Sequence, residues 1–144
     1  MKIVLQRVKY ASVKVDGETV GKIDNGYLLL FGVGHEDTEE ECRRLGDKII
    51  GLRIFSDEND KINLNLEAVD GSILVVPQFT LYADCRKGNR PNFIQAAKPE
   101  DANRLYEYFV EYLRSKGQKV ETGSFGADMK VELLNDGPFT IILE

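Results

Sequence analysis

SILVVPQFTLYA, residues 72–83, is the most strand-like stretch of the chain. Its first half is a continuous apolar run, which is typical of a buried strand. Pro77 interrupts the run, because proline has no N–H to donate to a ladder. Beyond it, Gln78 and Thr80 share one face by the two-residue period of a strand. This polar pair is either the solvated face of a bulged edge strand or a site presented to a ligand.

Regular elements are expected on both sides of this segment. Upstream, Asp16-Gly17 is a hairpin signal between apolar stretches, and three glutamates follow a capping Asp37 or Thr38 at the start of a helix over 38–51. Downstream, Pro99 opens a second helix with one apolar stripe. The other expected strands and turns lie at 2–8, 12–15, 24–26, 27–33, 53–66, 118–123, 128–135 and 138–144.

Strands interrupted by two helices that do not alternate strictly with them indicate an α+β fold. We expect a curved, mostly antiparallel sheet or an open β-barrel with two helices, in a single domain over residues 1–144. The composition, 42% hydrophobic and 30% charged, is that of an ordinary globular protein. No apolar run approaches the roughly 18 residues that span a bilayer, and the N-terminus does not read as a secretion signal. We therefore expect a cytoplasmic protein with no membrane partner.

The inventory of reactive side chains is short. His35 is the only histidine, in a stretch that reads as a solvated loop between a strand and a helix. Cys42 and Cys85 lack CxxC spacing and are expected to be free thiols. A zinc site would lack histidine as a ligand beyond this one residue, so no metal is expected. No cofactor is expected either. Any catalysis is expected to proceed without imidazole.

A second unusual stretch is Asn-Asp-Gly-Pro-Phe-Thr at residues 135–140. Its residue types indicate a turn between two apolar strands. A functional alternative is a rigid backbone corner presented to a ligand, with a cis peptide as its extreme form. Only about 5–6% of X-Pro bonds in folded proteins are cis, so residue-level physics favours an ordinary trans turn.

Taken together, these motifs resemble those of the D-aminoacyl-tRNA deacylase family. The two most specific pieces are Gln78-Phe79-Thr80 and the Asn-x-Gly-Pro-x-Thr segment at 135–140. The resemblance extends over essentially the whole chain. Its other matching stretches are residues 1–8, 13–17, 32–34, 52–55, 81–83, 86–88 and 123–129.

The resemblance implies a homodimer that hydrolyses the ester between a D-amino acid and the 3′-terminal adenosine of tRNA. Gly137-Pro138 would be cis and would project from one subunit into the active site of the other. There its carbonyl groups would occupy the space that an L side chain needs, which rejects one enantiomer by a clash. Glycine has no side chain, so glycyl-tRNA is expected to be cleaved as well.

The resemblance also implies that Gln78, Phe79 and Thr80 carry the catalytic site. Thr80 could be the nucleophile, but an unactivated hydroxyl is weak and no histidine stands near it in the sequence. We favour a second route, in which the 2′-hydroxyl of the terminal ribose activates water while backbone groups around 78–80 hold the carbonyl. Pro77 departs from the family pattern, which has serine there. A catalytic role for that hydroxyl is therefore excluded in this chain.

Phe125 and Met129 resemble family positions that pack the terminal adenine, although core packing explains such residues equally well. Arg7 is a charged residue in an apolar strand, and it either supports the site or lies on the solvated face.

The net charge of −5 is unusual for an RNA-binding protein, because cationic side chains dominate affinity for phosphates. A local basic loop, Arg86, Lys87 and Arg90, is the candidate tRNA contact. Two rival hypotheses are compatible with the same sequence: a nucleic-acid-binding module without catalytic activity, and a hydrolase of small esters with Thr80 as nucleophile.

Overall fold

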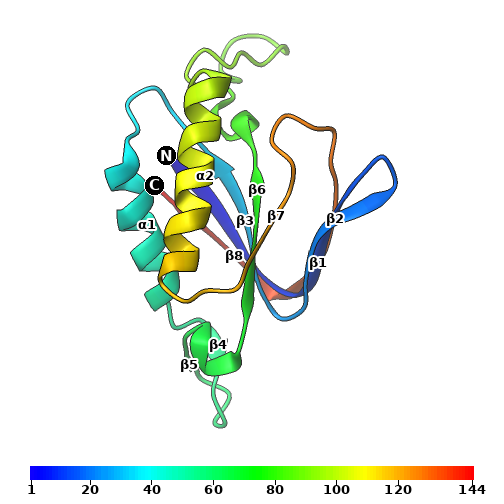
Figure 1. Cartoon of the computed structure of the whole chain (residues 1–144), viewed down its shortest axis with the longest axis vertical. Coiled ribbons are helices and arrows are strands. Elements are labelled where there is room, and N and C mark those ends of the chain that lie inside the picture. The colour runs from blue at the N-terminus through cyan, green and yellow to red at the C-terminus, as the bar shows by residue number, and fades with distance from the viewer.

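The computed structural model describes residues 1–144 and contains a six-stranded sheet, a two-stranded hairpin and two α-helices (Figure 1). The elements in chain order are β1 (Lys2–Val15), β2 (Glu18–Ile23), β3 (Gly26–Gly32), α1 (Glu39–Gly51), β4 (Phe55–Ser56), β5 (Ile62–Leu64), the 3₁₀ turn η1 (Glu67–Val69), β6 (Ser72–Pro77), the 3₁₀ turn η2 (Phe79–Tyr82), α2 (Pro99–Ser115), β7 (Val120–Thr122) and β8 (Lys130–Leu143).

The long strand β1 organises the sheet. Its first half pairs with β3 and its second half with β2, both antiparallel. β8 pairs antiparallel with residues of both halves, so it lies along the opposite edge of β1. The hairpin expected at Asp16-Gly17 is confirmed, since both residues adopt the positive φ angles that such a turn requires.

The other half of the sheet is parallel. β3 pairs with β6, and β6 pairs with β7, and in each case a helix lies in the connection between the two strands. Parallel neighbours need such a crossover, because a tight turn reverses the chain. Three of the five pairings in this sheet are antiparallel, so the expected α+β fold with a curved, mostly antiparallel sheet is confirmed.

The two ends of the sheet meet at a seam that nearly closes a barrel. β2 and β7 are the terminal strands of the pairing order, and they lie in contact. A Cβ placed on Gly21 would lie 2.2 Å from the carbonyl oxygen of Thr122. The close approach of the two backbones at the seam therefore requires glycine in β2.

Both helices begin where local signals predict. Thr38 is the N-cap of α1, and its side chain and that of Glu41 form a reciprocal capping box. α2 has Pro99 in its first turn, where no N–H is needed. Neither helix is long and apolar enough to cross a membrane.

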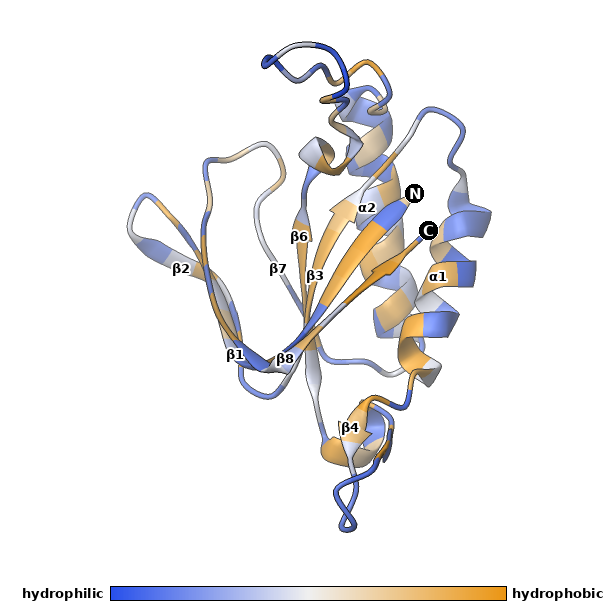
Figure 2. Ribbon diagram, turned by 180° about the vertical axis from the view of Figure 1, so that it is seen from behind, coloured by the Kyte–Doolittle hydropathy of each residue, from blue (hydrophilic) through white to orange (hydrophobic).

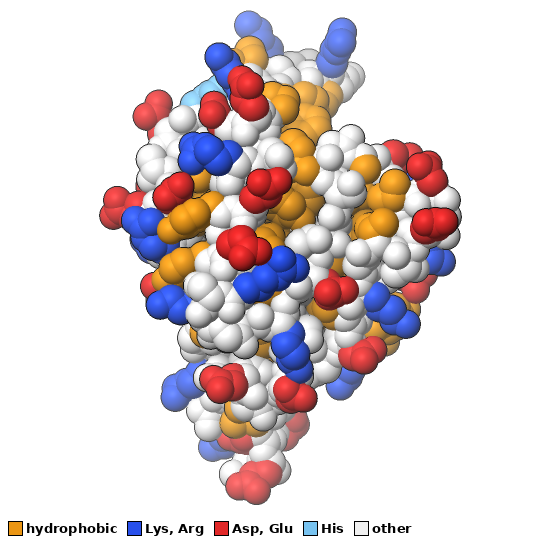
Figure 3. Space-filling view, in the orientation of Figure 1, with side chains coloured by type: hydrophobic (Ala, Val, Ile, Leu, Met, Phe, Trp, Pro, Cys, Tyr) orange, Lys and Arg blue, Asp and Glu red, His pale blue; other side chains and the backbone are white.

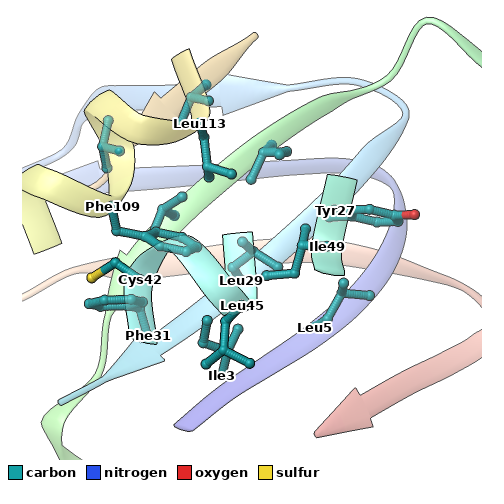
Figure 4. Packing of buried hydrophobic residues seen from close by; sticks show 14 of the residues in the cluster. Ile3, Leu5, Tyr27, Leu29, Phe31, Cys42, Leu45, Ile49, Phe109 and Leu113 are labelled. Atoms are coloured by element: carbon teal, nitrogen blue, oxygen red, sulfur yellow. The ribbon is translucent and has the colours of Figure 1, made fainter. Parts of the chain in front are cut away.

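The main core lies between the helices and one face of the sheet (Figures 2 and 4). It contains 21 buried residues, among them Phe31 and Phe109, whose rings stack with centroids 4.7 Å apart. A second cluster of seven buried residues includes Val8, Leu28 and Leu74. Strands buried in this way explain the continuous apolar runs of β3 and β6.

Four sequence-based expectations need correction. The strand expected over 72–83 ends at Pro77, and the chain continues as η2. The segments 2–8 and 12–15 form the single strand β1, and most of 128–135 and 138–144 form the single strand β8. Both strands are continuous because they pair with each other along most of their length. The turn expected at 24–26 is a bend, after which the chain keeps running along β1.

Candidate active site

A cavity of about 640 Å³ opens between the upper half of α2 and the segment that joins β7 to β8, where hydrophobic side chains gather on the surface (Figure 3). Its walls come from segments far apart in the sequence. They comprise Phe31, Val33, Val76, Pro77, Gln78, Phe79, Phe93, Ala96, Ala97, Lys98, Pro99, Ala102, Phe125, Gly126, Ala127, Asp128, Met129 and Val131. The volume is in the range of small-molecule and cofactor sites.

One wall is the polar segment that follows β6. The amide of Gln78 donates to the carbonyl of Phe31 (2.8 Å), which extends the pairing with β3 by one residue past Pro77. The chain then tightens into η2, so the Gln78 side chain donates from Nε2 to Oγ1 of Thr80 (2.5 Å). Gln78 and Phe79 line the cavity, whereas Thr80 does not. The hydroxyl of Thr80 therefore binds the side chain of Gln78 and is not itself part of the cavity lining.

The opposite wall carries the two residues that the family resemblance assigns to adenine. Phe125 and Met129 both line the cavity and are half-buried. The ring of Phe125 lies 6.1 Å from that of Tyr106, and Sδ of Met129 accepts a hydrogen bond from the amide of Ser124 (3.3 Å). An aromatic ring and a thioether held in this way offer an apolar surface on which a base can stack.

Titratable groups are scarce in the cavity. Lys98 and Asp128 are the only ionisable side chains in its lining, and Asp128 is paired with Lys130 at 3.2 Å. Sequence reasoning missed both residues, although the position of Asp128 next to Met129 was a usable signal. No cluster of three or more potential metal ligands occurs. The site therefore has polar backbone groups and apolar walls, and neither a histidine nor a cysteine in its lining.

The expected turn at 135–140 is a bulge in β8. Residues 136–139 leave the ladder between Asn135, which lies opposite Val8, and Thr140, which lies opposite Gln6. The Asn135 side chain closes the bulge by donating to Oγ1 of Thr140 (2.9 Å) and accepting from the amide of Phe139 (2.7 Å). We call residues 136–139 the β8 corner.

The Gly137-Pro138 bond in this corner is cis, as the family resemblance implies and contrary to the trans turn favoured by residue-level physics. Both residues are exposed, and neither lines the cavity of its own chain.

Arg7 supports the β8 corner from β1. Its side chain is buried, donates from Nε to the carbonyl of Asp136 (2.9 Å) and from Nη1 to the carbonyl of Ile54, and lies 4.8 Å above the ring of Phe139. The solvated alternative for this residue is therefore wrong. A guanidinium can satisfy two carbonyl groups that point in different directions, which explains the charge in an apolar strand.

The remaining candidates lie outside the cavity. Arg86, Lys87 and Arg90 are exposed on the loop above α2, and Arg86 forms two hydrogen bonds with Asp84 that lower the pKa of that carboxyl to about 2. Cys85 is a free, exposed thiol. Cys42 is also free, but burial raises the pKa of its thiol to about 12, which leaves it protonated at neutral pH.

The chain is similar to known proteins over its whole length. The sequence profile of the family described as D-Tyr-tRNA(Tyr) deacylase matches residues 4–144. The D-aminoacyl-tRNA deacylases of Halalkalibacterium halodurans and Thermosipho africanus are 58% and 55% identical over the whole chain, which covers 99% and 97% of their lengths.

Among solved structures, the c-Myc DNA Unwinding Element Binding Protein superposes with a TM-score of 0.94 at 42% identity, covering all of this chain and 98% of the other. The chain thus belongs to the D-aminoacyl-tRNA deacylase family, whose members are hydrolases acting on aminoacyl-tRNA.

Proposed function

We propose that this protein hydrolyses the ester between a D-amino acid or glycine and the 3′-terminal adenosine of tRNA, and that it spares L-aminoacyl-tRNA. The observation that carries the proposal is the cavity, which brings the Gln78-Phe79 segment and the Phe125–Met129 wall into one volume. We assign the adenine to that apolar wall and the aminoacyl ester to the segment beyond Pro77. The proposed location is the cytoplasm.

The reaction is assigned to the backbone around 78–80 and to the substrate itself. The first amides of a helical turn have no partner within that turn, so the start of η2 offers donors to the ester carbonyl. Water activated by the 2′-hydroxyl attacks the carbonyl carbon, the bond to the ribose 3′-oxygen breaks, and that oxygen takes the proton. The absence of histidine and cysteine from the cavity lining supports this route.

Pro77 is compatible with this mechanism. The family pattern has serine at this position, and here a proline lines the cavity without a hydroxyl. The route through the backbone and the ribose needs no such group. A route that depends on a serine hydroxyl at position 77 is not available to this chain.

Rejection of L-aminoacyl groups is assigned to Gly137 and Pro138 of a second subunit. The β8 corner is exposed and held from behind by Arg7 and Asn135, while the cavity of the same chain does not include it. A two-fold axis would let each subunit supply the corner that the other lacks. The homodimer is therefore part of the proposal.

Deacylation of D-tyrosyl-, glycyl- and L-tyrosyl-tRNA at substoichiometric protein tests the function. We expect many turnovers with the first two substrates and at least a hundredfold slower release with the third. Stoichiometric retention of tRNA without release of amino acid would instead support a binding module, which is the second candidate because a structural relative is named for DNA binding. Hydrolysis of aminoacyl esters that lack the tRNA body would favour a small-ester hydrolase.

A further inference from the structure

An exposed aromatic pair lies at the mouth of the cavity. The rings of Phe79 in η2 and Phe93 in the loop before α2 meet edge to face, with centroids 5.1 Å apart, and both line the cavity. Phe79 is 56% exposed, Phe93 is 37% exposed and the adjacent Ile94 is 76% exposed. A cluster of exposed apolar side chains at the rim of a cavity is typical of a binding surface, whereas apolar side chains exposed singly are common on any protein surface.

The loop that carries Phe93 is held in place by its backbone. Asp84 and Asn92 exchange two backbone hydrogen bonds (2.8 and 3.1 Å), and the amide of Ala97 donates to the carbonyl of Val33 (2.9 Å). Nε2 of His35 donates to the carbonyl of Ile94 (2.5 Å). The position of the Phe93 ring is therefore set by contacts on both sides of it, and His35 has a structural role there.

The same loop is positively charged in an acidic protein. Residues 85–98 contain Arg86, Lys87, Arg90 and Lys98 and no carboxylate, although the whole chain has a net charge of −5. Arg86 is paired with Asp84, whereas the other three cations form no salt bridge. Positively charged side chains rise above the apolar surface at this end of the molecule (Figure 3).

We propose that the Phe79–Phe93 pair is the stacking site for the nucleobase that precedes the terminal adenosine, with Lys87 and Arg90 binding the phosphates of the same unpaired strand. The inference rests on the proposed function, because an adenosine on the Phe125–Met129 wall would leave its 5′ neighbour at the cavity mouth. Aromatic faces next to cations are the general device for holding unpaired RNA.

The test uses a D-tyrosyl RNA minihelix with an unpaired CCA end, and a second version that is abasic at the penultimate position. Stacking of one base corresponds to roughly a fivefold to hundredfold change in affinity. Phe93→Ala is expected to raise KM by about tenfold with kcat changed less than threefold. Phe93→Leu should behave like Phe93→Ala, and Phe93→Tyr like the parent. The control Ile62→Ala, which truncates an exposed isoleucine in the β4–β5 hairpin outside the cavity lining, should change KM less than twofold.

The abasic minihelix makes the test specific to stacking. With the parent protein it should raise KM by the same factor as Phe93→Ala, and combining the two changes should add nothing further. If the two increases in KM multiply when the changes are combined, the base and the Phe93 ring do not contact each other. That result would overturn the inference. Lys87→Ala with Arg90→Ala should lower the slope of log affinity against log salt by roughly 0.7 for each phosphate that the protein no longer neutralises.

Binding of the uncharged CCA-ended RNA, measured by fluorescence anisotropy, separates this inference from the proposed function. If the parent deacylates but Phe93→Ala binds the RNA as tightly as the parent, the stacking site is wrong and the deacylase stands. If the parent does not deacylate yet Phe93→Ala weakens binding about tenfold, the stacking site stands and the deacylase is wrong.

Discussion

At the scale of single residues, the hydrogen bond between Gln78 and Thr80 bears on the proposed catalytic route. Nε2 of Gln78 donates to the Thr80 hydroxyl oxygen, and Thr80 itself does not line the cavity. No histidine lies in the lining to remove the hydroxyl proton. The side chain of Thr80 is therefore suited to orienting Gln78 and poorly suited to attacking an ester.

Thr80→Ala is expected to retain deacylase activity within about tenfold of the parent, and Thr80→Ser to match the parent. A minihelix with a 2′-deoxy terminal ribose should lose at least a hundredfold in rate with either protein, which is about 2.7 kcal/mol of transition-state stabilisation. Single-turnover deacylation measures both effects. Full activity on the deoxy substrate together with an inactive Thr80→Ala would assign the nucleophile to Thr80.

At the scale of elements, the β8 corner depends on one buried cation from β1. Arg7 satisfies the carbonyls of Asp136 and Ile54 and lies over the ring of Phe139. Lys9 also faces the corner, 3.5 Å from the carboxylate of Asp136, but its side chain is largely exposed. Nε of Arg7 lies 3.8 Å from the same carboxylate, so both cations pair with Asp136, but only Arg7 is buried.

Arg7→Met is expected to destabilise the protein by about 2–4 kcal/mol, because two carbonyl groups lose their donor in a buried setting. For a chain of this size the melting temperature should fall by roughly 4–16 °C. The ratio of D- to L-tyrosyl-tRNA deacylation rates should fall as well, because the corner loses its support. Lys9→Met is the control and should cost less than about 1 kcal/mol. Unchanged discrimination in a folded Arg7→Met protein would place selectivity elsewhere.

The seam between β2 and β7 gives a second element-scale prediction. Gly21→Ala should destabilise the protein by about 1–3 kcal/mol, because the added carbon would meet the Thr122 carbonyl and force the strands apart. Gly51→Ala, at the end of α1 where nothing lies within 4 Å of the added carbon, should be neutral or stabilising by up to about 1 kcal/mol. Calorimetric unfolding compares the two. Equal stability of both variants would contradict the close approach at the seam.

At the scale of the whole molecule, β8 exposes two large apolar side chains beside the β8 corner. Leu134 and Ile142 are 50% and 68% exposed on either side of the β8 corner, and Tyr10 lies opposite Leu134 on β1. β8 pairs with β1 alone, so its other edge is free. These features support the proposed association of two copies through this face.

We expect the protein to sediment as a dimer at micromolar concentration. Ile142→Asp should shift it toward the monomer, because a carboxylate would be buried in the interface, and should lower the D-to-L rate ratio at the same time. Ile62→Asp changes another isoleucine that is more than half exposed, in the β4–β5 hairpin, and should leave both the dimer and the D-to-L rate ratio unchanged. A monomeric parent with full discrimination would remove the cross-subunit account.

Local signals in the sequence were sufficient for several elements. The cap expected at Asp37 or Thr38, Pro99 at the start of α2 and the Asp16-Gly17 turn each act through neighbouring residues, so the starts of both helices and the turn could be predicted from the local sequence. The family resemblance, rather than a local pattern, points to residues 78–80 and to Phe125 and Met129, and of these only Thr80 lies outside the cavity lining. Propensity, capping and motif identity are properties of short stretches of chain.

Other features depend on pairings between distant segments, and only the tertiary structure decided them. The parallel pairs β3–β6 and β6–β7, the continuity of β8 through its corner and the burial of Arg7 all arise from neighbours that no local pattern specifies. Lys98 and Asp128 became candidates only when the cavity brought their segments together. Sequence alone therefore determined the two helices and the first turn, because these rest on local contacts, and it indicated the candidate motifs through the family resemblance. The tertiary structure decided the ladder partners and the cavity, because strand pairing is set by long-range packing that a local pattern does not encode.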